Sequence, residues 1–160
     1  MTIVKELDAT DRRILQELDS DARMPTAMIA LRLGLARGTV QSRIEKLTSS
    51  GALRPNSARV KPAALGRPVG ASLQLELDQF LIAEAIQALA HIPEVLECFA
   101  HAGNTDLLLR VVAKDPEDLY RVSEEIRKCP GIRHTSTSLF LREVIPYRVT
   151  GLLAVPAAAD

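Results

Sequence analysis

The stretch LGLARGTVQSRIEKLTSSGALRP, residues 33–55, decides the fold of the first third of this chain. Counted from Val40, apolar side chains recur at Val40, Ile44 and Leu47, which is the i, i+4, i+7 spacing of one helix face. The positions between them are mostly polar or basic, and a stable helix keeps such side chains in solvent. The pattern predicts an amphipathic helix with a basic outer face.

Two shorter helices are expected before this one. Asp8 fits the N-cap of a first helix, and Asp11 places a second carboxylate in its first turn, where it suits the helix dipole. Thr26 is expected to cap a second helix, and Gly34 suits the left-handed turn that ends it. Three short helices, the last two joined by a tight turn with glycine, form a helix-turn-helix pattern. Residues 52–60 can add a small wing or ribbon.

The pattern changes after the linker-like stretch KPAALGRPVG, residues 61–70, which has two prolines, two glycines and no periodicity. Residues 71–78, ASLQLELD, alternate strictly between apolar and polar, as a half-buried strand does. The remaining elements are expected to be a helix (79–92), two strands (94–103 and 105–113), a helix from 115 to 128 and a last strand (132–144). The order βαββαβ is that of a ferredoxin-like plait.

We therefore predict an α+β protein, with an N-terminal helix-turn-helix (winged-helix-like) domain and a C-terminal ferredoxin-like βαββαβ plait. The expected domains are a helix-turn-helix domain (1–54), a linker or ribbon (55–70), the plait (71–146) and a C-terminal tail (147–160). The tail is rich in alanine, and we expect a partner subunit to be what orders it. The second face of the sheet also needs cover, which a partner's sheet can give, although a monomer core is the alternative.

Charge is distributed unevenly along the 160 residues. The chain has 20 basic and 20 acidic residues, so its formal net charge is zero. Residues 32–61 hold seven basic residues against the single acid Glu45, which gives this stretch +6 and leaves −6 for the rest. Such polarity favours an anionic partner bound at the basic segment.

The sequence argues against several other classes of protein. Cys98 and Cys129 form no CxxC pair and are expected to be reduced thiols, and the three histidines have no metal-ligand spacing. We expect no metal, no cofactor and no catalytic residue; His101 near Asp106 is the nearest approach to a catalytic dyad. No signal peptide or membrane span is predicted, because the apolar runs are far shorter than the roughly 20 residues needed, so a cytoplasmic location is expected.

An amphipathic basic helix is more often a solvated face than a DNA reader. The preceding helix and tight turn favour DNA here, because they form the scaffold that sets a helix in the major groove. The outer side chains are also types that reach base edges. The candidates for base contacts are Thr39, Gln41 and Arg43, and those for phosphate contacts are Arg37, Ser42, Lys46 and Arg54.

Four stretches, taken together and in order, resemble one family: the Lrp/AsnC, or feast/famine, regulators of bacteria and archaea. They are LDATDRRILQELDSDAR (7–23), GLARGTVQSRIEKLTSSGAL (34–53), VLECFAHAGNTDLLLRV (95–111) and PGIRHTSTSLFLREV (130–144). The resemblance implies a DNA-binding helix-turn-helix domain and an amino-acid-sensing plait. It also implies dimers formed through the plaits, often assembled further into octamers.

The same resemblance assigns an effector site. From the residues alone, HAGNTD (101–106) is a hairpin turn, in which Gly103 and Asn104 tolerate positive φ. The family uses this loop at a subunit interface to hold a free amino acid, which implies an effector site at Gly103, Asn104 and Asp106, with Thr135 and Thr137 as hydroxyl donors.

Two positions depart from the family pattern. Ala36 stands where the family usually has Ser or Thr to cap the recognition helix, and Leu107 stands where the sensing loop commonly has an aromatic residue. The first departure predicts a weaker helix cap. The second bears on which effector fits.

The predicted function is sequence-specific transcriptional regulation through DNA binding, modulated by an amino-acid effector. The expected partners are double-stranded DNA, further copies of the chain and a small amino acid. The alternative is a ferredoxin-like metabolic enzyme or regulatory subunit that uses its helix-turn-helix for protein contacts.

Overall fold

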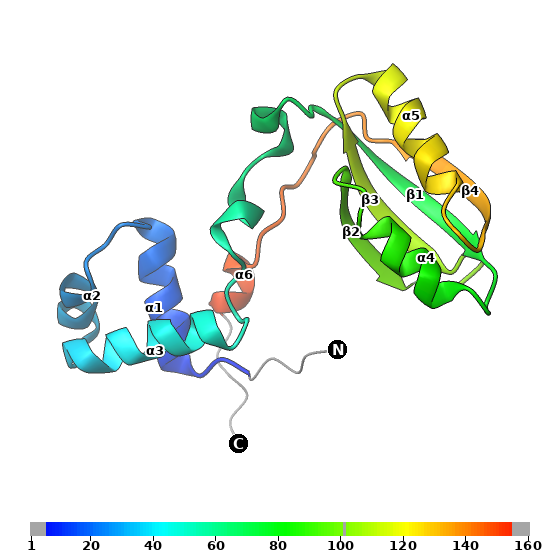
Figure 1. The fold of residues 1–160 in the computed structure, drawn as a ribbon. Coiled ribbons are helices and arrows are strands. Elements are labelled where there is room, and N and C mark those ends of the chain that lie inside the picture. The colour runs from blue at the N-terminus through cyan, green and yellow to red at the C-terminus, as the bar shows by residue number, and fades with distance from the viewer. Residues whose placement is uncertain (1–5, 101, 155–160) are drawn as a thin grey trace. The chain divides into compact units, whose positions relative to one another are not determined.

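The computed structural model describes residues 6–100 and 102–154, and these form two compact units (Figure 1). The first unit joins the described residues up to Arg59 to residues 145–154, and the second spans Val60–Val144. Each unit has a hydrophobic cluster of its own. No helix in the described part of the chain is long and apolar enough to cross a membrane.

The first unit contains the three predicted helices: α1 (Ala9–Ser20), α2 (Thr26–Leu33) and α3 (Arg37–Ser49). Asp8 caps α1 as predicted, because its Oδ1 accepts the Asp11 N–H at 2.8 Å. The prediction that Thr26 caps α2 is wrong. Pro25 holds the cap position and makes no side-chain cap bond, while Thr26 is the first helical residue. Proline suits a position just outside a helix, because its φ is fixed and it has no N–H to satisfy.

Gly34 makes the tight turn between α2 and α3. Its φ of 67° lies in the left-handed region that favours glycine. The next residue, Leu35, donates its N–H to the carbonyl of Ala30 at 2.9 Å and so closes the end of α2. The three helices then bury a small shared core of Ile14, Ile29, Ala30 and Val40.

The expected wing is absent from the described residues of the first unit. Residues 52–60 instead contain a 3₁₀ helix, η1 (Asn56–Arg59), and a second, η2 (Pro62–Leu65), follows at the start of the second unit. Pro55 lies within the predicted stretch and has no N–H to donate to a strand ladder, which disfavours a wing there.

The C-terminal segment also belongs to the first unit. A short helix, α6 (Thr150–Leu153), lies against α1 (Figure 1). Nη1 of Arg12 on α1 donates to the carbonyl of Leu152 at 2.8 Å. The expectation that a partner subunit must order the tail is therefore wrong for residues 147–154, while 155–160 lie outside the described residues.

The second unit is a four-stranded antiparallel sheet with two helices, in the predicted order βαββαβ. Its elements are β1 (Val69–Leu77), α4 (Ile82–Leu89), β2 (Val95–Ala100), β3 (Leu107–Ala113), α5 (Pro116–Arg127) and β4 (Ile132–Leu139). The spatial order is β2-β3-β1-β4, which confirms the ferredoxin-like plait.

Both helices cover the same face of this sheet. The alternating side chains of β1 (Ala71, Leu73, Leu75 and Leu77) are all buried in one cluster with apolar residues of α4 and α5. Leu73 and Leu75 are thus core residues of the monomer, the alternative left open by the sequence. Burial of one face imposes the period of two that was visible in the sequence.

Gly131 positions the start of β4 against the loop before α4. Its φ is 76°, and a Cβ there would lie 2.7 Å from the Cβ of Leu81, so only glycine fits without a shift. Its carbonyl accepts the N–H of Asp78 at 2.7 Å, which ties the end of β1 to the same turn.

Candidate nucleic-acid interface and effector loop

The outer face of α3 carries polar side chains on two flanks. Val40 and Leu47 are buried, which turns the opposite side of the helix to solvent. Thr39, Ser42 and Lys46 are exposed and follow one another at the i, i+3, i+7 spacing of one stripe. Arg37 and Gln41, four residues apart, are exposed on the other flank. The structure therefore brings five of the seven predicted DNA contacts onto the outside of one helix.

Gln41 is held in place by hydrogen bonds on both sides. Its Nε2 donates to Oε1 of Glu45 at 2.7 Å, and its Oε1 accepts the hydroxyl of Thr26 at 3.3 Å. The amide is therefore oriented before any ligand arrives. Glu45 was not among the predicted contacts, although its i+4 spacing from Gln41 is the signal that points to it.

Arg43, the third predicted base contact, does not share this exposed face. Its guanidinium turns toward α1, where Nη1 donates to Oδ2 of Asp8 at 2.6 Å and to Oδ1 of Asp11 at 2.8 Å. The Arg43 side chain is 32% exposed, and the Asp11 carboxylate beside it is 18% exposed. Arg43 lies next to the buried stripe, and two carboxylates of the α1 region are within its reach. It therefore joins α1 and α3 through ion pairs.

The same contacts shift pKa values. The hydrogen bond from Arg43, followed by that from the Asp11 N–H, holds the pKa of the Asp8 carboxyl below its usual value of 3.8. The two carboxylates in turn raise the pKa of Arg43, which stays charged at any physiological pH.

The N-terminus of α3 has no side-chain cap. Ala36 holds the cap position and contributes no side-chain hydrogen bond, as its departure from the family pattern predicts. The first N–H groups of a helix lack partners within the helix and are favourable sites for anions. An uncapped N-terminus beside Arg37 thus extends the cationic surface.

Arg54, the seventh predicted DNA contact, lies beyond α3 in the loop that follows Gly51. Its guanidinium carbon lies over the ring of Tyr147, 4.5 Å from the ring centroid. Tyr147 belongs to the C-terminal segment that joins the first unit. No local pattern in the sequence predicts this contact, because the two residues are 93 positions apart.

The loop between β2 and β3 holds the predicted effector residues. Gly103 has a φ of 149°, and Asn104 is exposed beside it. The carboxylate of Asp106 accepts the N–H of Leu77 at 2.7 Å and Nε2 of Gln79 at 2.9 Å. Asp106 therefore fixes the end of β1 as well as facing the loop. His101 lies outside the described residues.

The two threonines lie on the far side of β1 from Asp106. Thr135 pairs with Leu75 and Thr137 with Leu73, so both side chains share the face that the helices cover. Because β1 separates β4 from β3, the two sets lie roughly 10 Å apart, two strand spacings. Within one subunit they do not form a single cluster.

Within the described residues of the second unit, 60–100 and 102–144, the other face of the sheet carries no helix. Leu108 and Phe99 face one another there across β2 and β3, and the Phe99 ring is 51% exposed. Arg110 and Glu97 lie next to them as an ion pair at 3.8 Å. This open face, defined by Phe99, Leu108, Glu97 and Arg110, has an apolar centre with a charged edge.

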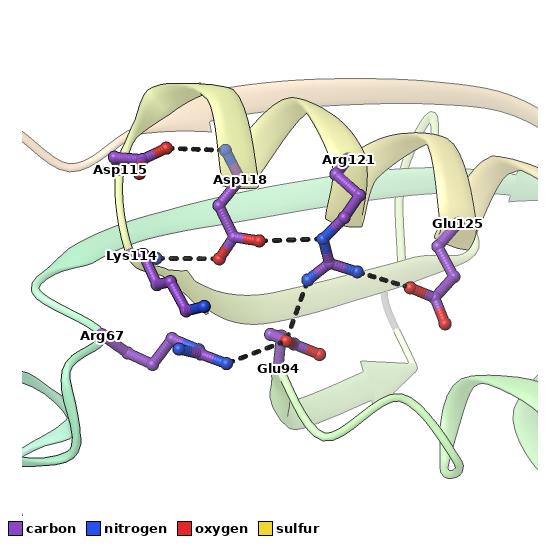
Figure 2. Close-up of polar contacts among 7 residues, drawn as sticks. All are labelled: Arg67, Glu94, Lys114, Asp115, Asp118, Arg121 and Glu125. Atoms are coloured by element: carbon purple, nitrogen blue, oxygen red, sulfur yellow. Dashed lines mark hydrogen bonds and ion pairs between the residues drawn. The ribbon is translucent and has the colours of Figure 1, made fainter.

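A buried ionic network that the sequence did not suggest lies on the helix side of the plait (Figure 2). Glu94 is 8% exposed, and its Oε1 accepts from Arg121 at 3.0 Å and from Arg67 at 3.4 Å. Arg121 also bonds Asp118 at 2.8 Å and Glu125 at 2.9 Å. The network fastens the segment before β1 to α5 through Glu94.

Asp118 accepts two hydrogen bonds in the network, as Glu94 does. The N–H of Lys114 bonds its Oδ2 at 2.9 Å, and this contact, followed by that of Arg121, lowers the pKa of the Asp118 carboxyl. Figure 2 shows the ion pairs that Arg121 makes with Glu94, Asp118 and Glu125, and the one that Arg67 makes with Glu94.

Comparison with known proteins accounts for both units. Residues 7–48 match the AsnC-type helix-turn-helix domain, and residues 71–150 match the Lrp/AsnC ligand binding domain. This chain belongs to the Lrp/AsnC family. The family consists of transcriptional regulators that bind DNA through the helix-turn-helix, and this Lrp/AsnC regulator has that domain ahead of its plait.

Individual relatives match over most of their length. The HTH-type transcriptional regulator FL11 of Pyrococcus abyssi is 32% identical over 136 residues, which are 85% of this chain and 90% of the relative. The structure of Escherichia coli AsnC superposes with a TM-score of 0.81 at 26% identity, covering 91% of this chain and 99% of that one.

A third relative was solved with a small molecule. The feast or famine regulatory protein of Mycobacterium tuberculosis, complexed with L-methionine, superposes with a TM-score of 0.77 at 32% identity. It covers 90% of this chain and 98% of that one.

Proposed function

We propose that this Lrp/AsnC regulator reads DNA with the outer face of α3, and that a free amino acid bound near the loop 103–106 modulates that binding. The single observation that carries the DNA assignment is the face of α3 itself. Arg37, Thr39, Gln41, Ser42 and Lys46 are exposed there, on a helix whose inner side is fixed by the buried core. The regulator is proposed to act without catalysis.

The side chains divide into two roles. Thr39 and Gln41 lie in the first half of α3, the part of a recognition helix that contacts base edges, and a glutamine amide pairs with adenine through two hydrogen bonds. The contacts to Thr26 and Glu45 support this role for Gln41, because they orient the amide in advance. The residues proposed to contact phosphates are Arg37, Ser42, Lys46 and Arg54. Arg43 is not proposed as a base contact, because its guanidinium bonds Asp8 and Asp11.

The effector proposal rests on the chemistry of the loop. The carboxylate of Asp106 can pair with an ammonium group while keeping its two present donors, because an ionised carboxylate has about four acceptor sites. Exposed loop amides at Gly103 and Asn104 suit a carboxylate. The L-methionine complex of the Mycobacterium tuberculosis relative supports an α-amino acid as the class of ligand. Thr135 and Thr137 remain proposed hydroxyl donors, from a second subunit.

A second copy of the chain is the proposed partner of the open face. Phe99 and Leu108 put apolar surface at its centre, and Arg110 and Glu97 can pair with the opposite charges of a two-fold related sheet. Two recognition helices in one dimer would read half-sites about one DNA turn, ~34 Å, apart. The octamer implied by the family resemblance is proposed as a further assembly of such dimers.

Selection of bound sequences from random DNA, with and without an amino-acid mixture, tests the proposal. The expected result is a two-fold related consensus whose recovery changes with amino acid present. Binding to the selected duplex should weaken steeply as salt rises, because each phosphate contact releases about 0.9 counterions. Recovery of no consensus at low salt would overturn DNA reading, and binding that does not depend on salt would favour a helix-turn-helix used for protein contacts.

A further inference from the structure

The Gln41 amide has hydrogen-bond partners on two different helices. Its Nε2 donates to Oε1 of Glu45, one turn further along α3, at 2.7 Å. Its Oε1 accepts the hydroxyl of Thr26, the first residue of α2, at 3.3 Å. Gln41 and Glu45 are exposed and Thr26 is half-buried, so the three side chains form a polar cluster on the surface of the first unit.

The carboxylate of Glu45 determines which end of the Gln41 amide is the donor. An ionised carboxylate only accepts hydrogen bonds, so the amide group that faces it must be the NH2 group. The amide oxygen then faces Thr26, whose hydroxyl donates to it. Without the charge of Glu45, either end of the amide could face Thr26, because a hydroxyl both donates and accepts.

This orientation leaves a defined pattern for a base. An amide has two N–H donors and two acceptor lone pairs, and the contacts with Glu45 and Thr26 use one of each. One donor and one acceptor remain, which is the pattern that pairs with N7 and N6 of adenine in the major groove. Guanine presents two acceptors there, N7 and O6, so a fixed amide oxygen finds no donor to pair with.

We propose that Glu45 and Thr26 are positioning residues that hold the Gln41 amide in the orientation that selects adenine over guanine. The inference rests on the proposed function, since it takes Gln41 as a base contact. It adds the choice between the two purines, and it assigns that choice to two residues that act through Gln41.

The physical reason is the freedom of an exposed glutamine. Several rotatable bonds separate its amide from the backbone, so an unrestrained amide also reaches orientations in which its NH2 group faces the acceptors of guanine. Holding the amide in advance removes those orientations and lowers the entropy lost on binding adenine. Exclusion of water from the groove then strengthens both holding contacts.

Glu45 has an opposing effect on affinity. Arg37, Gln41 and Glu45 follow one another at intervals of four residues, so they share one flank of α3 and the carboxylate lies on the face proposed to meet DNA. The phosphates of every sequence repel a negative charge there. Glu45 is thus expected to lower affinity in general while raising the preference for one base, a combination that a merely structural role would not produce.

The experiment compares affinities for three duplexes of equal length at one salt concentration. They are the duplex selected from random DNA, the same duplex with guanine in place of adenine at the position where Gln41→Ala loses discrimination, and an unrelated duplex. The full-length variants are Glu45→Ala, Thr26→Val and Thr26→Ser, each made with Gln41 present and in the Gln41→Ala background. Thr26→Val keeps the shape of the side chain without its hydroxyl, and Thr26→Ser is the matched control that keeps the hydroxyl.

We expect Glu45→Ala to reduce the preference for adenine over guanine by about two- to tenfold, the effect of one hydrogen bond. The same variant should bind the unrelated duplex more tightly than the wild type does. Thr26→Val should reduce the preference by about two- to threefold, since its contact is the longer one, and Thr26→Ser should match the wild type. In the Gln41→Ala background no substitution of Glu45 or Thr26 should change the preference.

Three results would overturn the inference. The first is an unchanged preference in Glu45→Ala. The second is a loss of preference that persists in the Gln41→Ala background, which would make Glu45 a base contact itself. The third is a selected base other than adenine at the position that Gln41→Ala affects. A Thr26→Val protein with the preference of the wild type would overturn the role of Thr26.

Failure of the inference is distinguishable from failure of the proposed function. If Gln41→Ala loses discrimination and Glu45→Ala does not, Gln41 reads its base unaided and only the inference falls. If Gln41→Ala keeps the discrimination of the wild type at every position, the base contact proposed for Gln41 falls as well.

Discussion

Nη1 of Arg43 lies 2.6 Å from Oδ2 of Asp8, the residue that caps α1, and 2.8 Å from Oδ1 of Asp11 in the first turn of that helix. One guanidinium thus joins the middle of α3 to the start of α1. The contact links the two helices at the surface, while the buried core of Ile14, Ile29, Ala30 and Val40 holds the inner side of α3.

This ion pair predicts a pH-dependent stability. The pKa of Asp8 is lowered in the folded protein, so the pair stabilises the fold fully above the unfolded value of 3.8 and loses that effect as pH falls through the lower folded value. Arg43→Met should lower the free energy of unfolding by about 0.5–1 kcal/mol at neutral pH, a modest figure because the Asp8 side chain is 55% exposed.

Urea denaturation of the wild type and Arg43→Met across pH checks this. The difference between the two proteins should shrink below pH 3.8. A difference that stays constant down to the acid limit of folding would show that the charge pair is not its cause. Sequence preference on selected DNA should be the same for both proteins.

The buried carboxylate of Glu94 predicts a larger stability effect in the plait. Glu94→Gln leaves Arg67 and Arg121 without their shared anion in a site where the Glu94 side chain is 10% exposed. We expect a loss of about 1–3 kcal/mol in the free energy of unfolding.

Glu125→Gln is the matched control for this prediction. It removes a partner of the same arginine, Arg121, but at a side chain that is 50% exposed, so the loss should be below about 0.5 kcal/mol. Equal losses for the two variants, measured by urea denaturation, would show that burial does not set the strength of the network.

Asp106 predicts how the effector is held. Asp106→Asn keeps an acceptor for the Leu77 N–H but removes the charge that would pair with an ammonium group. We expect at least about tenfold weaker binding of L-methionine or the amino acid that binds best, since hydrogen bonds to charged groups contribute ~1.5–3 kcal/mol. Isothermal titration of the twenty amino acids measures this.

Gln79→Ala is the control, because it removes the other side-chain contact of Asp106 and leaves the carboxylate. Its amino-acid affinity should stay close to that of the wild type. Unchanged binding by Asp106→Asn would remove Asp106 from the effector site and restrict it to fixing the end of β1.

The open face of the sheet predicts the oligomeric state. Phe99→Glu puts a charge at the centre of the proposed interface beside Leu108, and desolvation of that charge disfavours association. Analytical ultracentrifugation should show a smaller species than the wild type forms. Phe80→Glu, at a 92% exposed ring outside the sheet, should leave the assembly unchanged. A Phe99→Glu protein of wild-type size would place the interface elsewhere.

The sequence predicted the helices and strands in which burial of one face imposes a regular spacing of apolar residues. The alternation from Ala71 to Leu77 and the spacing of Val40 and Leu47 followed directly from one-sided burial, and all four side chains are buried. The left-handed turn at Gly34 followed from the same logic, because few other residues adopt its φ.

Features that depend on the reach of long side chains were not predictable in this way. Periodicity assigns Arg43 an angle on the helix, but a long side chain near the border of two faces can turn to carboxylates on another helix. The contact of Tyr147 with Arg54 and the buried position of Glu94 join segments distant in sequence, and one sequence contains no signal for them. The described residues contain no wing at 52–60, because the wing prediction did not weigh the effect of Pro55 on strand pairing.

The central claim is that the outer face of α3 distinguishes one base pair from another. It is tested most directly by the affinity of the wild type and Gln41→Ala for the selected duplex and for duplexes changed at one base pair at a time, at a fixed salt concentration. The account predicts that Gln41→Ala loses ~1–3 kcal/mol of discrimination at one position in each half-site and keeps it at the others. Discrimination that is the same for both proteins at every position would contradict it.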